Sequence, residues 1–463
     1  MDDINFKTYQ SPFSWRYGSN AMREIFSEIN RRKTWREVWV SIAKSQNKLG
    51  LISKQELADI VKNQNKIDIA KAHIIEDEIK HDLMAEVKTF AAQAKIGGGK
   101  IHLGATSQDI EDNADIIIYK KALDVVENDL KKLLKIWGGK IAQNADLICI
   151  AYTHLQPAEP TTLGYRFAVY AQDLMIDLEI LQNLKKQVKG KGIKGAVGNS
   201  ASYVSLLGNK ADLLEKQVLA DLKIDAFDVT GQVYPRKLDY LILNLLSLIA
   251  QSLYKFAFDL RIMQSAQFGE WMEPRSVKQV GSSAMPFKRN PQNAEKVCSL
   301  ARLISQMPKI AWDNAANSLL ERTLDDSASR RIVIPESFLA TDEILKVTTE
   351  IVENLTINKS NIEKNLKLYG PFSALEVILL KSTKKGADRQ KIHEKLREIS
   401  MQTYKEMEKN GKNMLFVNIK KDKEIGKYLK KDEIEKLFDY KNHIGFAPKK
   451  AKEMVTRIKT FLK

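Results

Sequence analysis

The sequence contains few of the residues that interrupt regular structure. Glycine and proline number 22 and 11 among its 463 residues, about 7% where roughly 12% is usual. A chain with so few turn residues favours long helices over many short strands, and no sustained alternation of apolar and polar residues indicates a sheet. We therefore predict an all-α fold, with a sizeable core supplied by the 44% of residues that are apolar.

Cysteine and histidine are also scarce. The two cysteines, Cys149 and Cys298, cannot form a disulfide framework and show no metal-ligand spacing. The six histidines offer no H-x-x-x-H pair; His73 and His81, for example, are eight residues apart. We expect a reducing compartment and no metal site.

The sequence lacks a long apolar run and a basic leader. Its longest apolar stretch without charge, residues 240–254, is shorter than the ~20 residues that span a bilayer. The N-terminal residues, MDDINFKTYQ, are acidic and polar, with no basic region followed by an apolar one. We expect a soluble, cytoplasmic protein.

Acidic residues are outnumbered by basic ones, which gives a net charge of +16. Nucleic-acid binding is one interpretation of such a charge. However, the lysines are scattered along predicted helices with little aromatic interleaving. We therefore expect a solvated lysine-rich surface and a cationic site for an anionic small molecule, and neither a nucleic acid nor a membrane as partner.

Three S/T-x-x-E sequences fit the capping box that begins many helices: Thr34-x-x-Glu37, Ser53-x-x-Glu56 and Ser360-x-x-Glu363. The first predicts a helix over residues 35–49 that ends at Gly50. Residues 238–263 are apolar except for a thin polar stripe, which predicts a helix buried on most of its circumference. An intersubunit bundle or the interior of a large monomeric bundle would bury it. Further long helices are predicted over residues 115–137, 162–189 and 295–320.

Breaks in the helical pattern lie at residues 97–104 and 358–360. They predict domains over residues 1–106, 107–357 and 358–463. Neither glycine-rich segment predicts a nucleotide cofactor. Gly97-Gly98-Gly99-Lys100 lacks the spacing of a phosphate loop, and the G-x-G-x-x-G sequence at residues 190–195 follows a predicted helix instead of a strand.

The segment richest in chemical groups is Gly281-Ser282-Ser283-Ala284-Met285-Pro286-Phe287-Lys288-Arg289-Asn290-Pro291, the signature loop. Small residues come first, then a proline, then two cations and an amide. Such a loop can close over an anion, with backbone N–H groups and Lys288 stabilising charge that develops on a carboxylate. A serine in it needs activation before it can act as a base. On composition alone, an ordinary flexible surface loop is an equal alternative.

The signature loop resembles the G-S-S-x-M-P-x-K-x-N motif of the fumarase/aspartase superfamily. This resemblance implies three mostly helical domains, a homotetramer with a central helical bundle, active sites shared between subunits, and elimination of fumarate without a cofactor. Tyr152-Thr153-His154-Leu155-Gln156-Pro157 is similar to the superfamily's T-H-x-Q-P segment, which carries the histidine acid. By residue type alone, His154 would more often be a loop or cap histidine.

Within the superfamily, the whole chain most resembles the animal-type adenylosuccinate lyases. The segments that carry this resemblance are Arg16-Tyr17, His81-Asp82-Leu83-Met84-Ala85, Ile101-His102-Leu103-Gly104-Ala105-Thr106-Ser107, Thr230-Gly231-Gln232-Val233-Tyr234 and Glu321-Arg322-Thr323-Leu324-Asp325-Asp326-Ser327-Ala328-Ser329-Arg330-Arg331. Succinylated purine nucleotides are then the implied substrates. Arginine forks suit their phosphate and carboxylates.

The resemblance implies Ser282 as base and His154 as acid, with Lys288 stabilising charge and His81 and Glu295 in supporting roles. The residues implied in substrate binding are Arg16, Tyr17, Asp82, Thr106, Ser107, Thr153, Gln156, Gln232, Met285, Asn290, Arg322, Ser327 and Arg331. Residue chemistry alone does not choose Ser282 over Ser283. It also leaves open that Arg322 and Arg331 form ion pairs with Asp325 and Asp326, and that Thr153 and Ser327 are helix caps.

The sequence departs from the family pattern in three places. Phe287 replaces a polar ring in the signature loop, Lys296 stands in place of an arginine, and Asn199-Ser200 replaces Thr-Gln. A lysine cannot repeat a bidentate arginine fork, so substrate preference is expected to be affected.

Two alternatives remain at this stage. One is another fumarate-releasing lyase of the superfamily, such as argininosuccinate lyase or fumarase, against which the residues 321–331 argue. The other is a catalytically silent structural or nucleic-acid-binding protein, against which the intact set of Ser282, Lys288, Asn290 and His154 argues.

Overall fold

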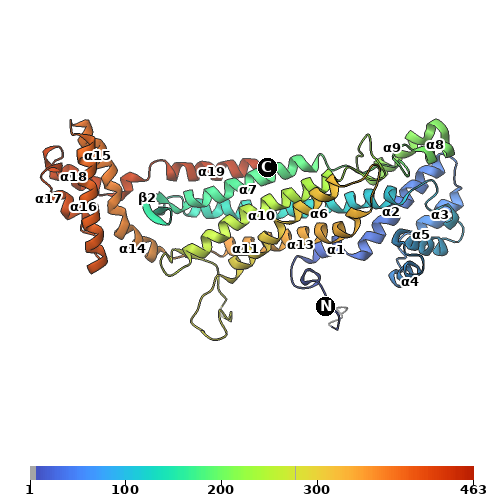
Figure 1. Ribbon diagram of the computed structural model, residues 1–463, viewed down its shortest axis with the longest axis horizontal. Helices are drawn as coiled ribbons and strands as arrows, with labels where there is room; N and C mark the ends of the chain where they lie inside the picture. The colour runs from blue at the N-terminus through green and yellow to red at the C-terminus, as the bar shows by residue number, and fades with distance from the viewer. Residues whose placement is uncertain (1–6, 277) are drawn as a thin grey trace. The chain divides into compact units, whose positions relative to one another are not determined.

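A computed structural model describes residues 7–276 and 278–463 of the chain. Residues 1–6, which carry most of the N-terminal segment interpreted above, lie outside the described residues. The described chain is mostly helical, as Figure 1 shows, and the all-α prediction is confirmed.

The chain divides into two compact units. Unit 1 comprises the described part of Met1–Leu130 together with Asp177–Leu253 and Ser299–Lys346, and unit 2 comprises Lys131–Ile176, Tyr254–Cys298 and Val347–Lys463. Four long helices contribute residues to both units: α6 (Ser107–Gln143), α7 (Leu163–Lys185), α10 (Lys237–Met263) and α13 (Asp325–Glu353). The predicted three-domain division at residues 106 and 357 stays a prediction.

The other helices of unit 1 are shorter. They are α1 (Asn20–Ile25), α2 (Glu28–Lys48), α3 (Lys54–Asn63), α4 (Ile69–Ile79), α5 (Asp82–Gln93), α8 (Ala201–Leu207), α9 (Ala211–Leu222) and α12 (Met307–Ala316). The core beside α13 includes Phe338, whose ring packs against Phe26 and Tyr119 at centroid distances of 5.4 and 6.4 Å. This packing joins α6 and α13, which both carry predicted site residues.

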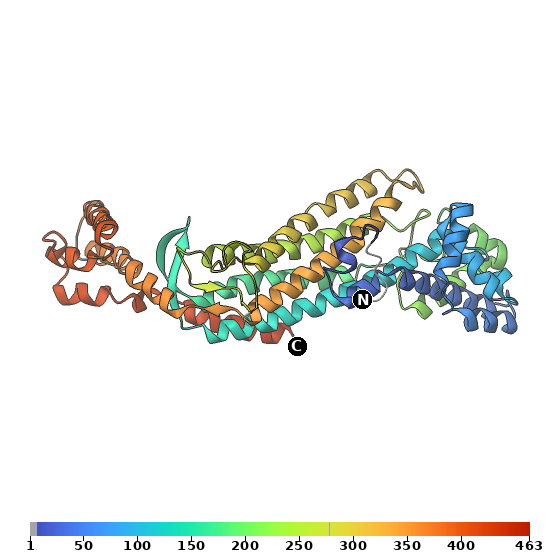
Figure 2. The ribbon, with the colours of Figure 1, turned by 90° about the horizontal axis from the view of Figure 1, so that it is seen from below.

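Unit 2 contains α14 (Lys359–Tyr369), α15 (Ala374–Lys384), α16 (Arg389–Asn410), α17 (Leu415–Lys421), α18 (Lys431–Leu437) and α19 (Ala447–Phe461), and most of α11 (Gln292–Ile304). In Figure 2, the orange and red helices α15–α18 gather into one group. Their shared core includes Ile378, Ile392, Leu415, Ile419 and Ile434, each 1% exposed or less.

Unit 2 also contains strands, which the sequence patterns do not predict. Strands β1 (Ile148–Thr153) and β2 (Gln156–Thr162) form an antiparallel hairpin, and β3 (Trp271–Met272) pairs with β4 (Thr356–Ile357). The expectation of no sheet is therefore wrong at these two places. Strand β2, with the sequence QPAEPTT, lacks the alternation of apolar and polar residues that marks a strand. Its extended conformation depends on pairing with β1, which the sequence pattern does not reveal.

Several helix predictions are confirmed. The capping box Ser53-x-x-Glu56 begins α3, with both reciprocal hydrogen bonds present. Helix α10 lies where residues 238–263 predict it, and α2 ends before Gly50, whose φ is +82°. Helix α10 is long and apolar enough to cross a membrane by length and composition, but 56% of its most apolar stretch is buried inside the structure, as in the core helix of a soluble protein.

Three helix boundaries differ from the predictions. Helix α2 begins after Ser27, so Thr34 lies inside it and its hydroxyl donates to the carbonyl of Asn30. Helix α14 begins after Asn358 instead of Ser360. The helix predicted over residues 295–320 is two helices, α11 and α12, because Pro308 cannot continue a helix but suits the first turn of the next one.

Candidate active site

Residues from α5, α6 and α13 form a polar cluster in unit 1. Asp82 Oδ2 accepts a bond of 2.6 Å from Nη2 of Arg331. His81, the N-cap of α5, has its Nε2 3.5 Å from the hydroxyl of Ser107 at the start of α6. Burial of Asp82 raises its pKa, but the adjacent Arg331 outweighs this effect, so the pKa lies below its usual value. Asp82 therefore stays ionised and holds the Arg331 guanidinium in place.

A cavity of about 70 Å³ lies beside this cluster. Its lining includes three predicted substrate-binding residues, Arg322, Ser327 and Arg331. The polar and charged residues that complete the lining are Arg31, Gln108, Glu111, Asp115, Tyr119 and Arg330. Four arginines against two carboxyl groups make this cavity suited to an anion.

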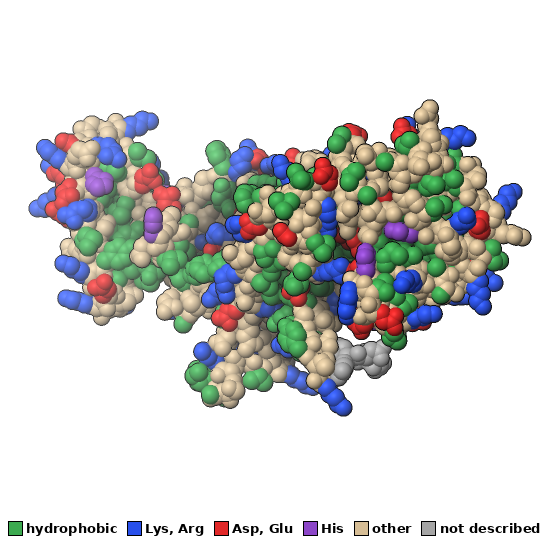
Figure 3. All heavy atoms as spheres, turned by 45° about the vertical axis from the view of Figure 1, so that its right-hand side comes forward, with side chains coloured by type: hydrophobic (Ala, Val, Ile, Leu, Met, Phe, Trp, Pro, Cys, Tyr) green, Lys and Arg blue, Asp and Glu red, His purple; other side chains and the backbone are tan. Residues whose placement is uncertain are grey.

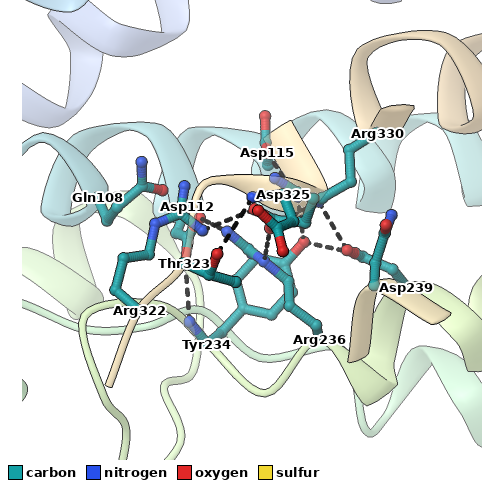
Figure 4. A network of polar contacts seen from close by, with 12 residues as sticks. Gln108, Asp112, Asp115, Tyr234, Arg236, Asp239, Arg322, Thr323, Asp325 and Arg330 are labelled. Atoms are coloured by element: carbon teal, nitrogen blue, oxygen red, sulfur yellow. Dashed lines mark hydrogen bonds and ion pairs between the residues drawn. The ribbon is translucent and has the colours of Figure 1, made fainter. Parts of the chain in front are cut away.

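A network of buried ion pairs supports the cavity (Figure 4). Arg236 bonds Asp112 at 3.0 Å and Asp326 at 2.6 Å, and Arg322 bonds the other oxygen of Asp326 at 2.8 Å. Arg330 contacts Asp239, Asp115 and the Tyr234 hydroxyl at 2.7 to 3.0 Å. Of the ion pairs left open by the sequence, the one between Arg322 and Asp326 is present, whereas Arg331 pairs with Asp82.

The remaining predicted residues of unit 1 lie on loops and helix ends. Arg16 is exposed, and its guanidinium carbon lies 5.8 Å from the ring centre of Tyr17. The backbone N–H of Thr106 donates to Asp109 at 3.0 Å, which places Thr106 just before α6. Gln232 donates its side-chain amide to the carbonyl of Ala196 at 3.0 Å. None of these three residues lines the 70 Å³ cavity.

His154 lies in unit 2 at the tip of the β1–β2 hairpin. Thr153 pairs with Gln156, and the two residues between them form the turn. His154 and Leu155 both have positive φ angles, 53° and 59°, as a two-residue hairpin turn that matches the twist of its strands requires. All four residues are exposed. The turn therefore holds the His154 side chain at the exposed tip of the hairpin.

The signature loop, also in unit 2, is held by hydrogen bonds to its first residue. The Gly281 carbonyl accepts from Nδ2 of Asn290 at 2.9 Å and from Nε2 of Gln292 at 3.2 Å. A Cβ at Gly281 would lie 2.2 Å from the carbonyl oxygen of Lys288, so only glycine fits there. The hydrogen bonds from Asn290 and Gln292 to Gly281 bring the two ends of the loop together. The loop borders a cavity of about 540 Å³.

The predicted reacting groups lie along this loop. The Ser282 hydroxyl accepts from the N–H of Met285 at 3.1 Å and is half-buried, whereas Ser283, Met285 and Lys288 are exposed. Phe287 is 80% exposed, so little of its ring packs against the loop.

Helix α11 begins directly after the loop. Glu295 lies exposed in its first turn. The N-terminus of α11 is capped by Glu273, whose carboxylate accepts from the N–H groups of Asn293 and Ala294 at 3.1 and 3.0 Å. Burial raises the pKa of Glu273. The motifs do not reveal Glu273, because it precedes the loop by eight residues and its role appears only when the chain folds back.

The structure thus brings the predicted residues into separate groups. His81, Asp82, Ser107, Arg322, Ser327 and Arg331 gather in unit 1, and the signature loop residues with Glu295 gather in unit 2. The hairpin tip in unit 2 carries Thr153, His154 and Gln156. Beyond the residues that the resemblance implies, the cavity lining includes Arg330, Gln108 and Glu111. Arg330 lies within the segment of residues 321–331, but its acidic partners are far away in the sequence.

Comparisons with known proteins agree over nearly the whole chain. A family model described as "Lyase" matches residues 16–305, and one described as "Adenylosuccinate lyase C-terminus" matches residues 371–455. Adenylosuccinate lyase of Schistosoma mansoni is 39% identical over 91% of this chain and 89% of its own length. That of Saccharomyces cerevisiae is 36% identical over 98% of this chain and 95% of its own length. The chain belongs to the adenylosuccinate lyase family. The resemblance inferred from the motifs is confirmed, including the similarity to an animal relative.

Solved structures show the same fold. The 3-carboxy-cis,cis-muconate lactonizing enzyme of Pseudomonas putida matches 98% of this chain and 100% of its own with a TM-score of 0.87 at 23% identity. A fumarate lyase from Mesorhizobium sp. BNC1 matches 97% of this chain and 99% of its own with a TM-score of 0.83 at 21% identity. In the described part of this family member, no three His, Cys, Asp or Glu side chains are grouped as metal ligands. Cys149 and Cys298 are both buried.

Proposed function

We propose that this member of the adenylosuccinate lyase family releases fumarate from adenylosuccinate, giving AMP. We propose the same reaction on the succinylated aminoimidazole carboxamide ribotide (SAICAR), giving its free amide (AICAR). Both are β-eliminations in purine nucleotide biosynthesis. The observation that carries the proposal is the arginine-lined cavity of unit 1, formed by the family's own residues Arg322, Ser327 and Arg331.

The charges of the substrate support this assignment. Each substrate carries a phosphate and two succinyl carboxylates. The cavity presents several guanidinium groups around a small space, and α13 begins beside it at Asp325, so the positive end of the helix dipole lies near the cavity. Each guanidinium carries five donors, so an existing ion pair such as Arg322–Asp326 leaves donors for a ligand. We assign the phosphate end of the nucleotide to this cavity.

The signature loop is the proposed place of proton abstraction. Ser282, as the alkoxide, removes a proton from the succinyl carbon next to a carboxylate, and the electron pair moves onto that carboxylate. Lys288, Asn290 and loop N–H groups stabilise this charge more than that of the ground state. The electron pair then returns from the carboxylate to form the carbon–carbon double bond of fumarate. As it does so, the C–N bond breaks and its electrons leave with the nitrogen.

His154 is the proposed acid for the departing nitrogen. An imidazole has an ordinary pKa of about 6.5, so it can hold a proton for transfer near neutral pH. Its place on an exposed, tightly turned hairpin tip leaves it free to contact a ligand. His81 and Glu295 are proposed to position the substrate or His154, and Tyr17, Thr106, Thr153, Gln156, Gln232 and Met285 to contact it.

We further propose a homotetramer in which active sites are shared between subunits. The exposure of the hairpin tip, of Arg16 and of most of the signature loop fits residues that meet partners or substrate. The basic side chains, in contrast, are spread over the face shown in Figure 3 and do not form one continuous patch. This distribution agrees with a small-molecule substrate and gives no support to a nucleic-acid partner.

The proposal is tested by following fumarate release by NMR with purified protein and three substrates. Adenylosuccinate and SAICAR should each give stoichiometric fumarate, with AMP or AICAR as the second product. Argininosuccinate should give none, because its guanidino group offers nothing to the cationic cavity. Release from argininosuccinate alone would contradict the proposal, and release from none of the three would do the same.

A further inference from the structure

Glu111 is a carboxyl group in the unit 1 cavity that the family motifs do not include. It lies on α6, four residues after Ser107, and its Oε2 accepts from Nε2 of Gln108 at 2.5 Å. It is half-buried, and it borders the same cavity as Arg322, Ser327 and Arg331. A carboxyl group among residues suited to an anion requires a physical explanation.

Charged groups approach Glu111 from three helices. Asp82 comes from α5, Asp112 and Asp115 from α6 itself, and Arg331 from α13. The cavity lining adds Arg31 from α2 and, from the region of α13, Arg322 and Arg330. Burial, followed by the neighbouring Asp82 and Asp115, raises the pKa of Glu111 to about 8. At neutral pH this side chain is therefore mostly an uncharged acid.

The two protonation states of Glu111 differ in what they offer a phosphoryl group. A neutral carboxyl group has one O–H donor, which can bond a phosphoryl oxygen, whereas an ionised carboxylate only accepts. The ionised form also places a negative charge beside the phosphoryl dianion, and it competes with that dianion for the Arg331 guanidinium. One oxygen already accepts from Gln108, so the other remains for a ligand.

We propose that Glu111 binds the phosphoryl group of the nucleotide as a neutral acid, and that loss of its proton at alkaline pH releases the nucleotide. This inference rests on the proposed function for the identity of the nucleotide. It goes beyond it by assigning a ligand contact to Glu111 and a pH dependence to the phosphate end of the site.

The size of the effect follows from the fraction of protein that is protonated. If only the neutral form binds, the apparent Kd for AMP rises about tenfold between about pH 7 and pH 9. A glutamine at position 111 is uncharged, has nearly the same shape and keeps a donor. The Kd of Glu111→Gln should therefore change less than about twofold over the same range.

The test is calorimetry of AMP binding to the full chain at both pH values, in two buffers with different ionisation enthalpies. Wild-type protein should take up about one proton per AMP near pH 9, and Glu111→Gln should take up none. Glu408→Gln, at an exposed position of α16, is the matched control and should behave as the wild type. A wild-type Kd that is independent of pH, or equal proton uptake by Glu111→Gln, would overturn the inference.

Two further measurements separate this inference from the proposed function. The wild-type measurement needs no variant, so an absence of proton uptake by the wild type rejects the inference even if Glu111→Gln fails to fold. Inorganic phosphate replaces AMP in a second titration. If the protein releases no fumarate but takes up a proton on binding phosphate, and this uptake depends on Glu111, the proposed function is rejected and the assignment of the cavity is kept. Fumarate release without proton uptake on AMP binding would reject the role of Glu111 alone.

Discussion

Two adjacent hydroxyls begin the signature loop, and their surroundings differ. The Ser282 hydroxyl is half-buried and accepts a hydrogen bond from the N–H of Met285. Such a donor stabilises an alkoxide, which a base needs. Ser283 is exposed. Residue chemistry alone does not choose between the two, and these surroundings support the proposal of Ser282 as the base.

We therefore expect Ser282→Ala to lose about 10²- to 10⁴-fold in kcat, the usual contribution of general base catalysis. Ser283→Ala is the matched control and should keep most of the activity. Fumarate release at saturating adenylosuccinate measures both, with circular dichroism as a check on folding. A folded Ser282→Ala protein with near-normal kcat would exclude Ser282 as the base.

Residues of the candidate site could be predicted from the sequence to the extent that motifs carry them. Arg322, Ser327 and Arg331 line one cavity as the resemblance implies. Glu111, Glu273 and Arg330 are not predictable from motifs, because their surroundings depend on contacts distant in sequence. Arg330 acts through Asp115 and Asp239, which are 215 and 91 residues away along the chain.

At the scale of the element, the signature loop depends on one close backbone approach. Gly281 lies opposite the Lys288 carbonyl. Its own carbonyl accepts hydrogen bonds from the side-chain amides of Asn290 and Gln292. These contacts fix the position of Ser282 relative to Lys288 and Asn290. The requirement for glycine here is steric, since its φ does not lie in the left-handed region.

Gly281→Ala should consequently misplace the loop without unfolding the protein. A shift on the order of 1 Å in reacting groups can cost about 10²-fold in rate, and we expect a loss of that order in kcat/KM. The melting temperature should stay near that of the wild type, because most of the loop is exposed. Gly426→Ala is the control, since a Cβ there meets nothing within 4 Å. Equal activity of the two variants would contradict the steric argument.

Elements with strong local signals were predictable, and elements fixed by tertiary contacts were not. The capping box of α3 and the apolar length of α10 are properties of a few neighbouring residues, and both predictions hold. Helix α2 extends upstream of Thr34 because Ser27 caps it and Arg32 is held by Glu28 and Glu86. The β1–β2 hairpin has no alternating pattern of apolar and polar residues. Its strands are defined by their pairing with each other, which is a tertiary contact.

At the scale of the whole molecule, the candidate residues fall into two groups on two compact units. The proposed base, Ser282, and Lys288 lie on the signature loop in unit 2, and the arginines proposed to bind the phosphate lie in unit 1. The proposed homotetramer, with active sites shared between subunits, makes a further prediction about mixed assemblies. A shared site needs an intact loop from one subunit and an intact arginine cavity from another.

Mixing two inactive variants should then restore activity. Ser282→Ala removes the proposed base in unit 2, and Arg331→Ala removes a proposed phosphate ligand in unit 1, at a side chain that is 48% exposed. After the two proteins are dissociated and reassembled together, random mixing in a symmetric oligomer gives roughly a quarter of sites with both residues intact. Fumarate release should recover to roughly that fraction. The control mixes Ser282→Ala with Lys288→Ala, which lie on the same loop and should never restore one another. If neither mixture recovers activity while native mass spectrometry shows mixed tetramers, the loop and the cavity act within one subunit and the shared-site proposal fails.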